Sequence, residues 1–423
     1  MMEPTSLLRA LFDAAVAAAS GERLLPFLPA PPRGRTLVVA AGKAAAAMAQ
    51  VVAQTWPAEA SLSGFAVTPY GHGVGAIPRI ATIEAAHPVP DQAGLDAGAQ
   101  ILAQARLLGA DDLLLCLMSG GASSLLTVPA AGLSLSDKQA INRGLLRSGA
   151  DIRTMNVVRK HLSAIKGGRL AAAAAPARIV TLAISDIPGD DLAVIGSGPT
   201  CPDPSTSAEA LAALVRYQFS APAGVMAHLT SPSAETPKPG DPIFAGSHAD
   251  LVATPADALK AAAALARSMG VVPIILGDAI EGEAAAIARQ MAAQALDYAR
   301  SSAERPCVLL SGGETTVTLP AEPSPNARGG RNSEFLLALA IALGGDPRVY
   351  ALACDTDGID GSENNAGAVI TPSSLVRLAA QGLQPEALLA AHASYTGFDA
   401  LGDLIVTGPT RTNVNDFRAI LIV

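Results

Sequence analysis

The chain repeats one local pattern: a short apolar run, then a loop rich in Gly, Ser and Asp, then an alanine-rich segment. Such apolar runs lie at 36–40, 112–118, 178–184, 271–276, 307–310 and 348–354. Unbroken apolar runs indicate strands buried on both faces, and their alternation with helices is typical of parallel sheets covered by helices. The pattern therefore predicts an α/β fold with largely parallel sheets.

At 423 residues the chain exceeds the size of one ordinary core, so two domains are expected. The segment 230–242 (TSPSAETPKPGDP) has neither a helix nor a strand period and is the best candidate boundary. We place an N-terminal domain at 1–235 and a smaller C-terminal domain at 236–423, and leave open whether the last strand packs back on the first domain. The Pro-, Gly- and Arg-rich segment 320–332 is interpreted as a functional loop of the second domain.

The composition excludes several partners. The net charge is −8, and no basic run or aromatic–basic interleaving is present, which argues against nucleic-acid binding. No apolar segment reaches the roughly 18 residues needed to span a bilayer, and the first residues lack the positive region of a secretory signal. We expect a cytoplasmic monomer or homodimer without a membrane partner.

The polar loops of the first half lie where strands end, which is where open parallel sheets bind ligands. Gly42 and Lys43 follow one strand, and the block 119–124 (SGGASS) follows another. Bare glycine backbone favours phosphate or carboxylate, although an ordinary tight turn remains the alternative. A lysine at this place either neutralises charge on a transferring phosphoryl group or extends to solvent.

Two further segments of the first half carry charge. Asn156, Arg159 and Lys160 share one helix face, with Lys166 about one heptad beyond Arg159, and a solvated basic face is the alternative. Asp186 follows a strand in SDIPGDD, where it suits a turn, a general base or a Mg²⁺ site.

The second half has a matching set of loops. They are SGGE at 311–314, the GGRN block that contains Arg331, DTDGIDG at 355–361 and TGPTRTN at 407–413. Carboxylates facing a glycine-rich anion site are what Mg²⁺–nucleotide chemistry requires. Loops of this kind on both sides of the predicted boundary suggest two lips of one cleft.

The familiar nucleotide motifs are absent from the sequence. It contains no GxxxxGK[ST] loop and no protein-kinase signature, and no strand–GxGxxG–helix that would indicate a dinucleotide site.

Several long blocks are nevertheless specific to one family. AAGKAA, SGGASSLL, MNVVRKHLSAIKGGRL, SDIPGDD, SGGETTVT, RGGRNSEF, DTDGIDG and TGPTRTNVND follow one another between about residue 40 and residue 417. In this order they strongly resemble the class II glycerate 2-kinases, also called the MOFRL family after its C-terminal domain. Members of that family have often been labelled hydroxypyruvate reductases.

The resemblance implies an N-terminal Rossmann-like α/β/α sandwich and a smaller α/β MOFRL domain, with the active site in the cleft between them. It implies transfer of the ATP γ-phosphate to the 2-hydroxyl of D-glycerate, with Mg²⁺. The family's catalytic lysine and arginine match Lys43 and Arg331. A small residue, usually Gly, is expected where Arg411 stands, so the loop that carries Asn413 departs from the family pattern.

On this basis Lys43, Arg331 and Asp186 are expected to be catalytic, with Asp186 as base or metal-linked orienter. Asp186, Glu314 and Asp355 are the predicted Mg²⁺ ligands. Substrate or nucleotide binding is predicted for Gly42, Ser119, Gly120, Gly121, Ser123, Arg159, Lys160, Ser311, Gly312, Gly313, Glu314, Asn332, Asp355 and Asn413. The alternatives are an NAD(P)H-dependent hydroxypyruvate reductase and a non-catalytic sugar-acid-binding protein.

Overall fold

The computed structural model describes residues 2–217, 221–301, 305–320 and 327–423. It divides into two compact units: a first unit of residues 20–252, and a second unit of residues 1–19 together with 253–423. None of the helices in these ranges is long and apolar enough to cross a lipid bilayer.

A six-stranded sheet forms the centre of the first unit, with the strand order β3-β2-β1-β4-β5-β6. Its strands are β1 (Thr36–Ala41), β2 (Leu62–Pro69), β3 (Ile80–Ala85), β4 (Leu113–Met118), β5 (Arg178–Ile184) and β6 (His248–Ala253). β1 is parallel to both neighbours, so that Val39 lies opposite Phe65 and Cys116. The chain runs outward from β1 to β3 and then returns to β4 on the other side. The strand order therefore reverses between β1 and β4.

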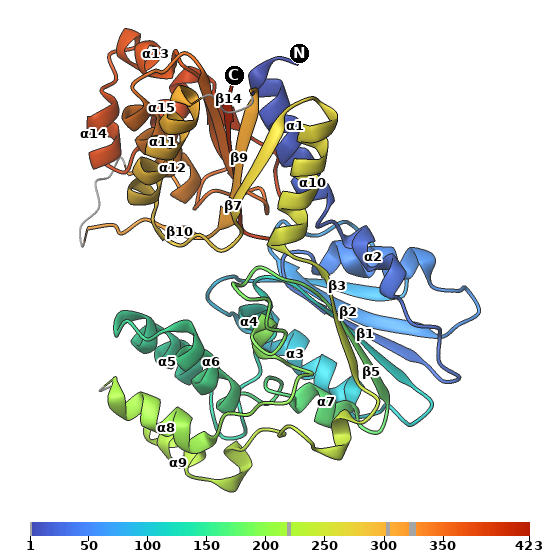
Figure 1. Ribbon diagram of the computed structural model, residues 1–423. Helices are drawn as coiled ribbons and strands as arrows, with labels where there is room; N and C mark the ends of the chain where they lie inside the picture. The colour runs from blue at the N-terminus through green and yellow to red at the C-terminus, as the bar shows by residue number, and fades with distance from the viewer. Residues whose placement is uncertain (1, 218–220, 302–304, 321–326) are drawn as a thin grey trace. The chain divides into compact units, whose positions relative to one another are not determined.

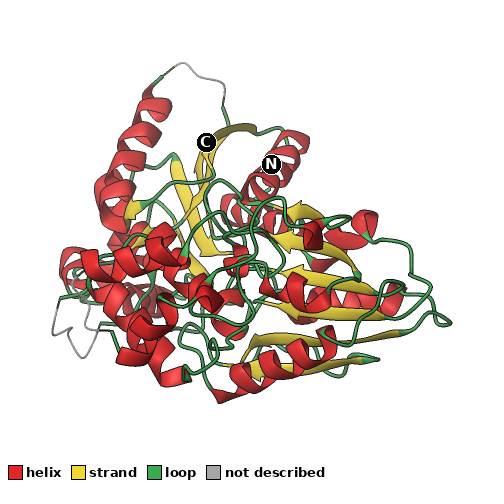
Figure 2. Cartoon of the chain, turned by 90° about the horizontal axis from the view of Figure 1, so that it is seen from below, coloured by secondary structure: helices red, strands yellow, loops and turns green. Residues whose placement is uncertain are grey.

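Helices cover both faces of this sheet (Figures 1 and 2). Leu37, Val39 and Ala41 pack in one apolar cluster with α3 and α7, and the alternate residues Val38 and Ala40 point to the opposite face, toward α2. The α-helices are α2 (Ala45–Thr55), α3 (Gln92–Ala105), α4 (Ala122–Leu125), α5 (Leu135–Arg147), α6 (Ile152–His161), α7 (Arg169–Ala174), α8 (Ser207–Arg216) and α9 (Ala223–Leu229). The 3₁₀ segments are η1 (Gly21–Phe27), η2 (Ile195–Ser197), η3 (Pro232–Ala234) and η4 (Pro242–Phe244).

Four of these helices form a layer with a core of its own. α5, α6, α8 and α9 bury a separate apolar cluster, to which α5 contributes Ile141 and Leu145, and α6 contributes Met155 and Val158. α6 therefore has one face committed to this small core, and its remaining faces carry the charged residues.

The second unit contains another six-stranded sheet, with the order β13-β12-β11-β14-β9-β7. Its strands are β7 (Val272–Gly277), β9 (Cys307–Gly313), β11 (Val349–Asp355), β12 (Gly367–Ile370), β13 (Leu404–Ile405) and β14 (Asp416–Ile422). β8 (Gly282–Glu283) and β10 (Thr315–Thr316) form a small separate sheet. β14 is inserted between β9 and β11 and is antiparallel to both.

Helices also lie on both faces of the second sheet, with α1 and α10 on one face and α11 and α12 on the other (Figure 1). These helices are α1 (Pro4–Ala17), α10 (Pro255–Ser268), α11 (Ala284–Arg300) and α12 (Arg331–Leu343). The shorter helices are α13 (Ser374–Ala380), α14 (Pro385–Ala390) and α15 (Ser394–Leu401).

The sequence analysis placed the domain boundary between residues 235 and 236, and the two observed units are divided at other positions. The N-terminal helix α1 belongs to the second unit because its apolar face packs on that sheet, where the Phe12 and Phe417 ring centroids lie 6.0 Å apart. The first unit extends to residue 252, since β6 adds the last strand to its sheet. The Pro-rich segment 230–242 thus lies within the first unit, where it includes η3.

The second sheet also corrects the expected strand direction. The α/β class is confirmed, but only β7 and β9 are a parallel pair there, and the other four pairs are antiparallel. β9 and β14 are nevertheless buried along their whole length. The apolar run of β9 therefore predicted burial on both faces correctly but did not determine strand direction, whereas the apolar run of β7 is only partly buried. The last strand, β14, belongs to the sheet of the second unit.

Candidate active site

The reversal of strand order in the first unit brings the ends of β1 and β4 together. Gly42 and Lys43 follow β1, and residues 119–121 follow β4. The backbone N–H of Lys43 donates to the carbonyl oxygen of Gly120 at 2.8 Å. In open α/β sheets, ligands bind in the crevice at such a reversal. Two loops that the sequence analysis selected separately are therefore neighbours at the place where the topology favours a ligand.

Two glycines in these loops have no room for a side chain. Gly42 has φ of 122°, and a Cβ there would lie 2.2 Å from Ser119 Oγ. Gly121 has φ of 85°, and a Cβ there would lie 3.1 Å from His87 Nε2 and 3.7 Å from Lys43 Cγ. The half-buried Lys43 side chain thus lies beside the uncovered backbone of Gly121.

The two serines of the 119–124 block that were predicted to bind ligand, Ser119 and Ser123, have different environments. Ser119 is fully buried, and its Oγ accepts a hydrogen bond from the N–H of Ala44 at 3.0 Å. Ser123 Oγ lies 2.9 Å from Ser197 Oγ, which donates to Asn156 Oδ1 at 3.2 Å. Ser119 therefore holds the two loops together, whereas Ser123 belongs to a chain of polar side chains that reaches α6.

The predicted basic face of α6 divides into two parts. Lys160 Nζ lies 3.3 Å from Asp203 Oδ1 in a nearly buried ion pair. Arg159 Nε donates to Asn142 Oδ1 at 3.1 Å, and burial lowers the pKa of Arg159. Lys160 thus forms an ion pair within the first unit. Arg159 forms no ion pair with a carboxylate among the residues that the structure describes.

Asp186 lies two residues beyond β5 and is half-buried. β5 is parallel to β4, so the loops that follow the two strands lie at the same edge of the sheet. Asp186 and the 119–121 loop therefore lie at the same edge, as expected of neighbouring parallel strands.

In the second unit Arg331 is the centre of a carboxylate cluster. Arg331 begins α12, and each of its guanidinium nitrogens donates to a different carboxylate: Nε to Asp416 Oδ1 at 2.8 Å, Nη1 to Glu314 Oε1 at 2.5 Å, and Nη2 to Asp355 Oδ2 at 2.7 Å. Burial alone would lower the pKa of Arg331, but the three carboxylates outweigh burial and raise it. We call these four residues the Arg331 cluster; its guanidinium is charged and fixed in one orientation.

Asp416, at the start of β14, is a member of this cluster that the sequence analysis did not select. Its side chain is fully buried, and its Oδ2 accepts a hydrogen bond from Arg418 Nη2 at 2.6 Å. Its Oδ1 accepts from Asn332 Nδ2 at 2.8 Å. One aspartate before an apolar strand carries no distinctive sequence signal, because Asp is common in turns.

A second buried carboxylate, Asp360, caps α12. Its two oxygens accept the backbone N–H groups of Asn332 at 2.9 Å and Ser333 at 2.8 Å. Burial raises the pKa of Asp360 to about 6 in spite of these hydrogen bonds. A Cβ at Gly330 would lie 2.3 Å from this carboxylate. Gly330 is thus needed for the close approach of the start of α12 to Asp360.

The predicted SGGE turn is in part a strand. Ser311, Gly312 and Gly313 pair with β14 as the last three residues of β9, so only Glu314 leaves the strand. Ser311 is 2% exposed, and its Oγ lies 3.9 Å from Met291 Sδ. The Ser311 hydroxyl therefore faces the core, and the part of Ser311 in ligand binding stays a prediction.

The loops 355–361 and 407–413 lie against each other in the second unit. The N–H of Thr410 donates to the carbonyl oxygen of Asp357 at 2.9 Å. A Cβ at Gly358 would lie 2.1 Å from the carbonyl oxygen of Gly408. These contacts bring together two loops that are distant in the sequence and join them to the strand that ends in Asp355.

Arg411 has the backbone conformation of a glycine. Its φ is 61°, in the left-handed region that residues with a Cβ rarely adopt. This agrees with the sequence-based expectation of a Gly at this position. Asn413, two residues on, is 3% exposed, and its Oδ1 accepts the N–H of Asn415 at 3.2 Å. The side-chain amide oxygen of Asn413 thus stabilises the loop in which Asn413 lies.

Of the predicted Mg²⁺ ligands, Asp186 lies in the first unit, and Glu314 and Asp355 lie in the second. Within the residues that the structure describes, no group of three His, Cys, Asp or Glu side chains could hold a metal ion. Glu314 and Asp355 bind Arg331 instead. Their carboxylate oxygens still suit Mg²⁺, which commonly takes only one or two protein carboxylates together with substrate phosphates.

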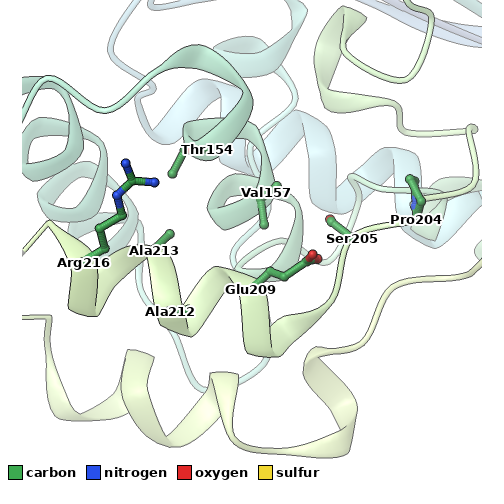
Figure 3. A pocket seen from close by; sticks show the side chains of 8 residues that line it. All are labelled: Thr154, Val157, Pro204, Ser205, Glu209, Ala212, Ala213 and Arg216. Atoms are coloured by element: carbon green, nitrogen blue, oxygen red, sulfur yellow. The ribbon is translucent and has the colours of Figure 1, made fainter.

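A cavity of about 600 Å³ lies between α6 and α8 (Figure 3). Its lining residues are Thr154, Val157, Pro204, Ser205, Glu209, Ala212, Ala213 and Arg216. None of them was predicted as a site residue. Thr154 and Val157 lie on a different face of α6 from Arg159. The lining of this cavity includes neither Ser123 nor Asn156.

Comparison with known proteins identifies the family. Residues 7–230 match a family described as "Domain of unknown function (DUF4147)", and residues 307–416 match the MOFRL family. A D-glycerate 2-kinase of Thermotoga maritima is 37% identical over 391 residues, which cover 92% of this chain and 91% of that protein. The chain belongs to the MOFRL family of glycerate kinases. The resemblance found in the sequence is thereby confirmed.

Other members of the MOFRL family extend the comparison. A protein of Agrobacterium vitis named "Putative hydroxypyruvate reductase" is 54% identical over 420 residues, which cover 98% of this chain and 94% of that protein. The crystal structure of a glycerate kinase from Thermotoga maritima matches with a TM-score of 0.88 at 35% identity and covers 99% of both chains. The fold of the chain is therefore that of a glycerate kinase.

Proposed function

We propose that this protein is a glycerate 2-kinase, which transfers the γ-phosphoryl group of ATP to the 2-hydroxyl of D-glycerate and forms 2-phosphoglycerate. The kinase names of its MOFRL relatives support the reaction. The observation that carries the proposal is the position of Lys43, beside the uncovered backbone of Gly121 at the strand-order reversal. D-glycerate and ATP are the proposed partners, and the cytoplasm is the proposed location of a monomer or homodimer.

Phosphoryl transfer requires positioning and positive charge more than covalent chemistry by the protein. In the proposal, the ammonium group of Lys43 stabilises negative charge on the transferring phosphoryl group. Gly120 and Gly121 allow an anionic oxygen to approach their backbone closely. Gly42 serves the same site by allowing the two loops to touch.

Arg331 is proposed as the second cation of the reaction. Because three carboxylates fix its guanidinium, it needs little reorganisation when a phosphate oxygen arrives. Glu314 is the partner that a phosphate could replace at lowest cost, since its side chain is 50% exposed, whereas that of Asp416 is fully buried.

Asp186 is proposed as the group that accepts the proton. The 2-hydroxyl oxygen of glycerate would form a bond to the γ-phosphorus, the bond from that phosphorus to the bridging oxygen of ADP would break, and the hydroxyl proton would pass to Asp186. Glu314 and Asp355 would hold Mg²⁺, which arrives with ATP and neutralises charge on its phosphate oxygens.

One relative's name points to hydroxypyruvate reduction as a second candidate. The two activities separate in one pair of assays on the purified protein. The proposal expects ADP formation that depends on D-glycerate, and no oxidation of NADH or NADPH when hydroxypyruvate is added. Reductase activity without ADP formation would reject the kinase proposal.

A further inference from the structure

Three basic side chains of the first unit converge without a carboxylate among them. Lys138 comes from α5, Arg159 from α6, and Lys166 from the turn that follows α6. Lys138 is 5% exposed and Lys166 is 1% exposed. Burial and then the charge of Arg159 lower the pKa of Lys138 to about 7, and burial, Lys138 and Arg159 lower the pKa of Lys166. Arg159 also contacts Asn142, which lies one helical turn after Lys138 on α5, so Arg159 reaches the same part of this helix.

We call Lys138, Arg159 and Lys166 the basic cluster. Two of its three side chains have hydrogen-bond partners among the described residues, and the third does not. Lys166 Nζ donates to the carbonyl oxygen of Ser123 at 2.7 Å, and Arg159 Nε donates to Asn142 Oδ1. Lys138 Nζ is buried and has no hydrogen-bond partner in the part of the chain that the structure describes. A buried ammonium group without a partner is strongly unfavourable. An anion placed among the three side chains would remove that cost.

The position of Lys138 on its helix argues against a purely structural role. Lys138, Ile141 and Leu145 follow the i, i+3, i+7 spacing of one helix face, and the latter two belong to the apolar core of the helical layer. An apolar side chain would suit position 138 better if packing were its only purpose, because an unpaired buried charge is destabilising.

The basic cluster contacts the segment after β4, which packs against the loop that carries Lys43. Lys166 binds the carbonyl oxygen of Ser123, and the Lys43 side chain lies beside Gly121, two residues earlier in the same loop. The basic cluster and Lys43 therefore both lie beside the segment 121–123, so one small 2-hydroxy acid is the kind of ligand that could contact both.

We propose that Lys138, Arg159 and Lys166 bind the carboxylate group of the acceptor substrate. This inference rests on the proposed function and adds to it the residues that recognise a 2-hydroxy acid. Lys138 and Lys166 are almost wholly buried, so their surroundings suit one small oxyanion rather than the polyphosphate of a nucleotide. None of the three has a carboxylate partner among the described residues, and such a carboxylate would be needed to hold the Mg²⁺ that accompanies ATP.

The proposal predicts how binding depends on pH. The charged groups that face Lys138 are Arg159 from α6 and Lys166 from the following turn, while Asp137 on its own helix accepts hydrogen bonds from Ser134. Because the pKa of Lys138 is about 7 without ligand, an anion must bind together with a proton above that pH. The affinity for the carboxylate should therefore fall as pH rises from 7 to 9.

The test compares Lys138→Met with Arg143→Met, which removes one positive charge from the exposed side of the same helix. Calorimetry without ATP measures binding of D-glycerate, and of inorganic phosphate as the competing anion. Steady-state kinetics give the KM values of glycerate and ATP. We expect Lys138→Met to weaken glycerate binding at least tenfold, to leave the KM of ATP within twofold, and to reduce the pH dependence between pH 7 and 9. Arg143→Met should match the wild type.

The outcomes separate this inference from the proposed function. Unchanged glycerate affinity in Lys138→Met, with normal kinase activity, would overturn the carboxylate site alone. A weakened KM for ATP, or tighter binding of phosphate than of glycerate, would assign the cluster to phosphate instead and reject the inference. If the wild type has no kinase activity, Lys138-dependent binding of glycerate would still support the site. Should Lys138→Met fail to fold, a wild-type affinity that does not fall above pH 7 would reject it.

Discussion

Arg331 and Asp416 are joined by a hydrogen bond of 2.8 Å from Nε to Oδ1, which ties the start of α12 to the start of β14. The same carboxylate receives Arg418 Nη2 at 2.6 Å, and both Asp416 and Arg418 are fully buried. The orientation of the proposed catalytic arginine thus depends on an aspartate in the last strand.

Asp416→Asn is expected to destabilise the protein by about 3 kcal/mol or more, because it leaves the buried charge of Arg418 uncompensated. Glu314→Gln removes the half-exposed partner of the same arginine and should cost less than about 1 kcal/mol. Urea unfolding of the two variants measures the difference. Equal losses of unfolding free energy would contradict the central role of Asp416.

Lys43→Ala should lower kcat at least 100-fold, since it removes positive charge from the proposed phosphoryl-transfer site. The unfolding free energy should change by less than about 1 kcal/mol, because the side chain is half-buried at the edge of the sheet. Lys260→Ala is the control, since it removes an exposed lysine of α10. A kcat near that of the wild type would refute the role of Lys43.

Asp360 should make stability depend on pH between about 4 and 6. Its pKa in the folded protein is about 6 and exceeds that of an unfolded Asp, so the folded state binds the proton more tightly. The contribution of Asp360 is therefore present below pH 4 and is lost as pH rises through 6. Urea unfolding from pH 4.0 to 6.5 should show the wild type losing stability relative to Asp360→Asn. A constant difference would contradict the raised pKa.

Arg411→Gly tests the backbone strain at φ of 61°. Gly adopts this conformation freely, whereas a residue with a Cβ pays roughly 1–2 kcal/mol for it. Arg411→Gly should therefore be more stable than Arg411→Ala by about 1 kcal/mol, although its unfolded chain is more flexible. Thermal unfolding of both variants provides the comparison. Equal stability would show that the left-handed backbone costs nothing here.

The sequence predicted the parts of the fold that depend on local pattern. The apolar runs at β1 and β4, each followed by glycine, indicated buried strands that end in ligand-facing loops, and those loops are neighbours at the strand-order reversal. Strand direction in the second sheet was not predictable in this way. β14 is buried along its whole length although it contains Asp416 and Arg418, and its insertion between β9 and β11 depends on pairing with distant segments.

The residues missed in the site share one physical reason. Asp416 and Lys138 are recognised only by burial and by partners that are distant in the sequence. Asp416 is one aspartate before a strand, and a lysine such as Lys138 usually extends to solvent. Lys43 and Arg331 were candidates because each follows a glycine in a polar loop, and the family resemblance then singled them out as catalytic.

The most direct test of the central claim is the identity of the product, read by phosphorus and carbon NMR after incubation of the purified protein with ATP, Mg²⁺ and D-glycerate. The account predicts equimolar ADP and 2-phosphoglycerate, with the new phosphorus signal coupled to the proton on C2. A phosphate on C3, or no phosphorylated glycerate while the protein is folded, would contradict it.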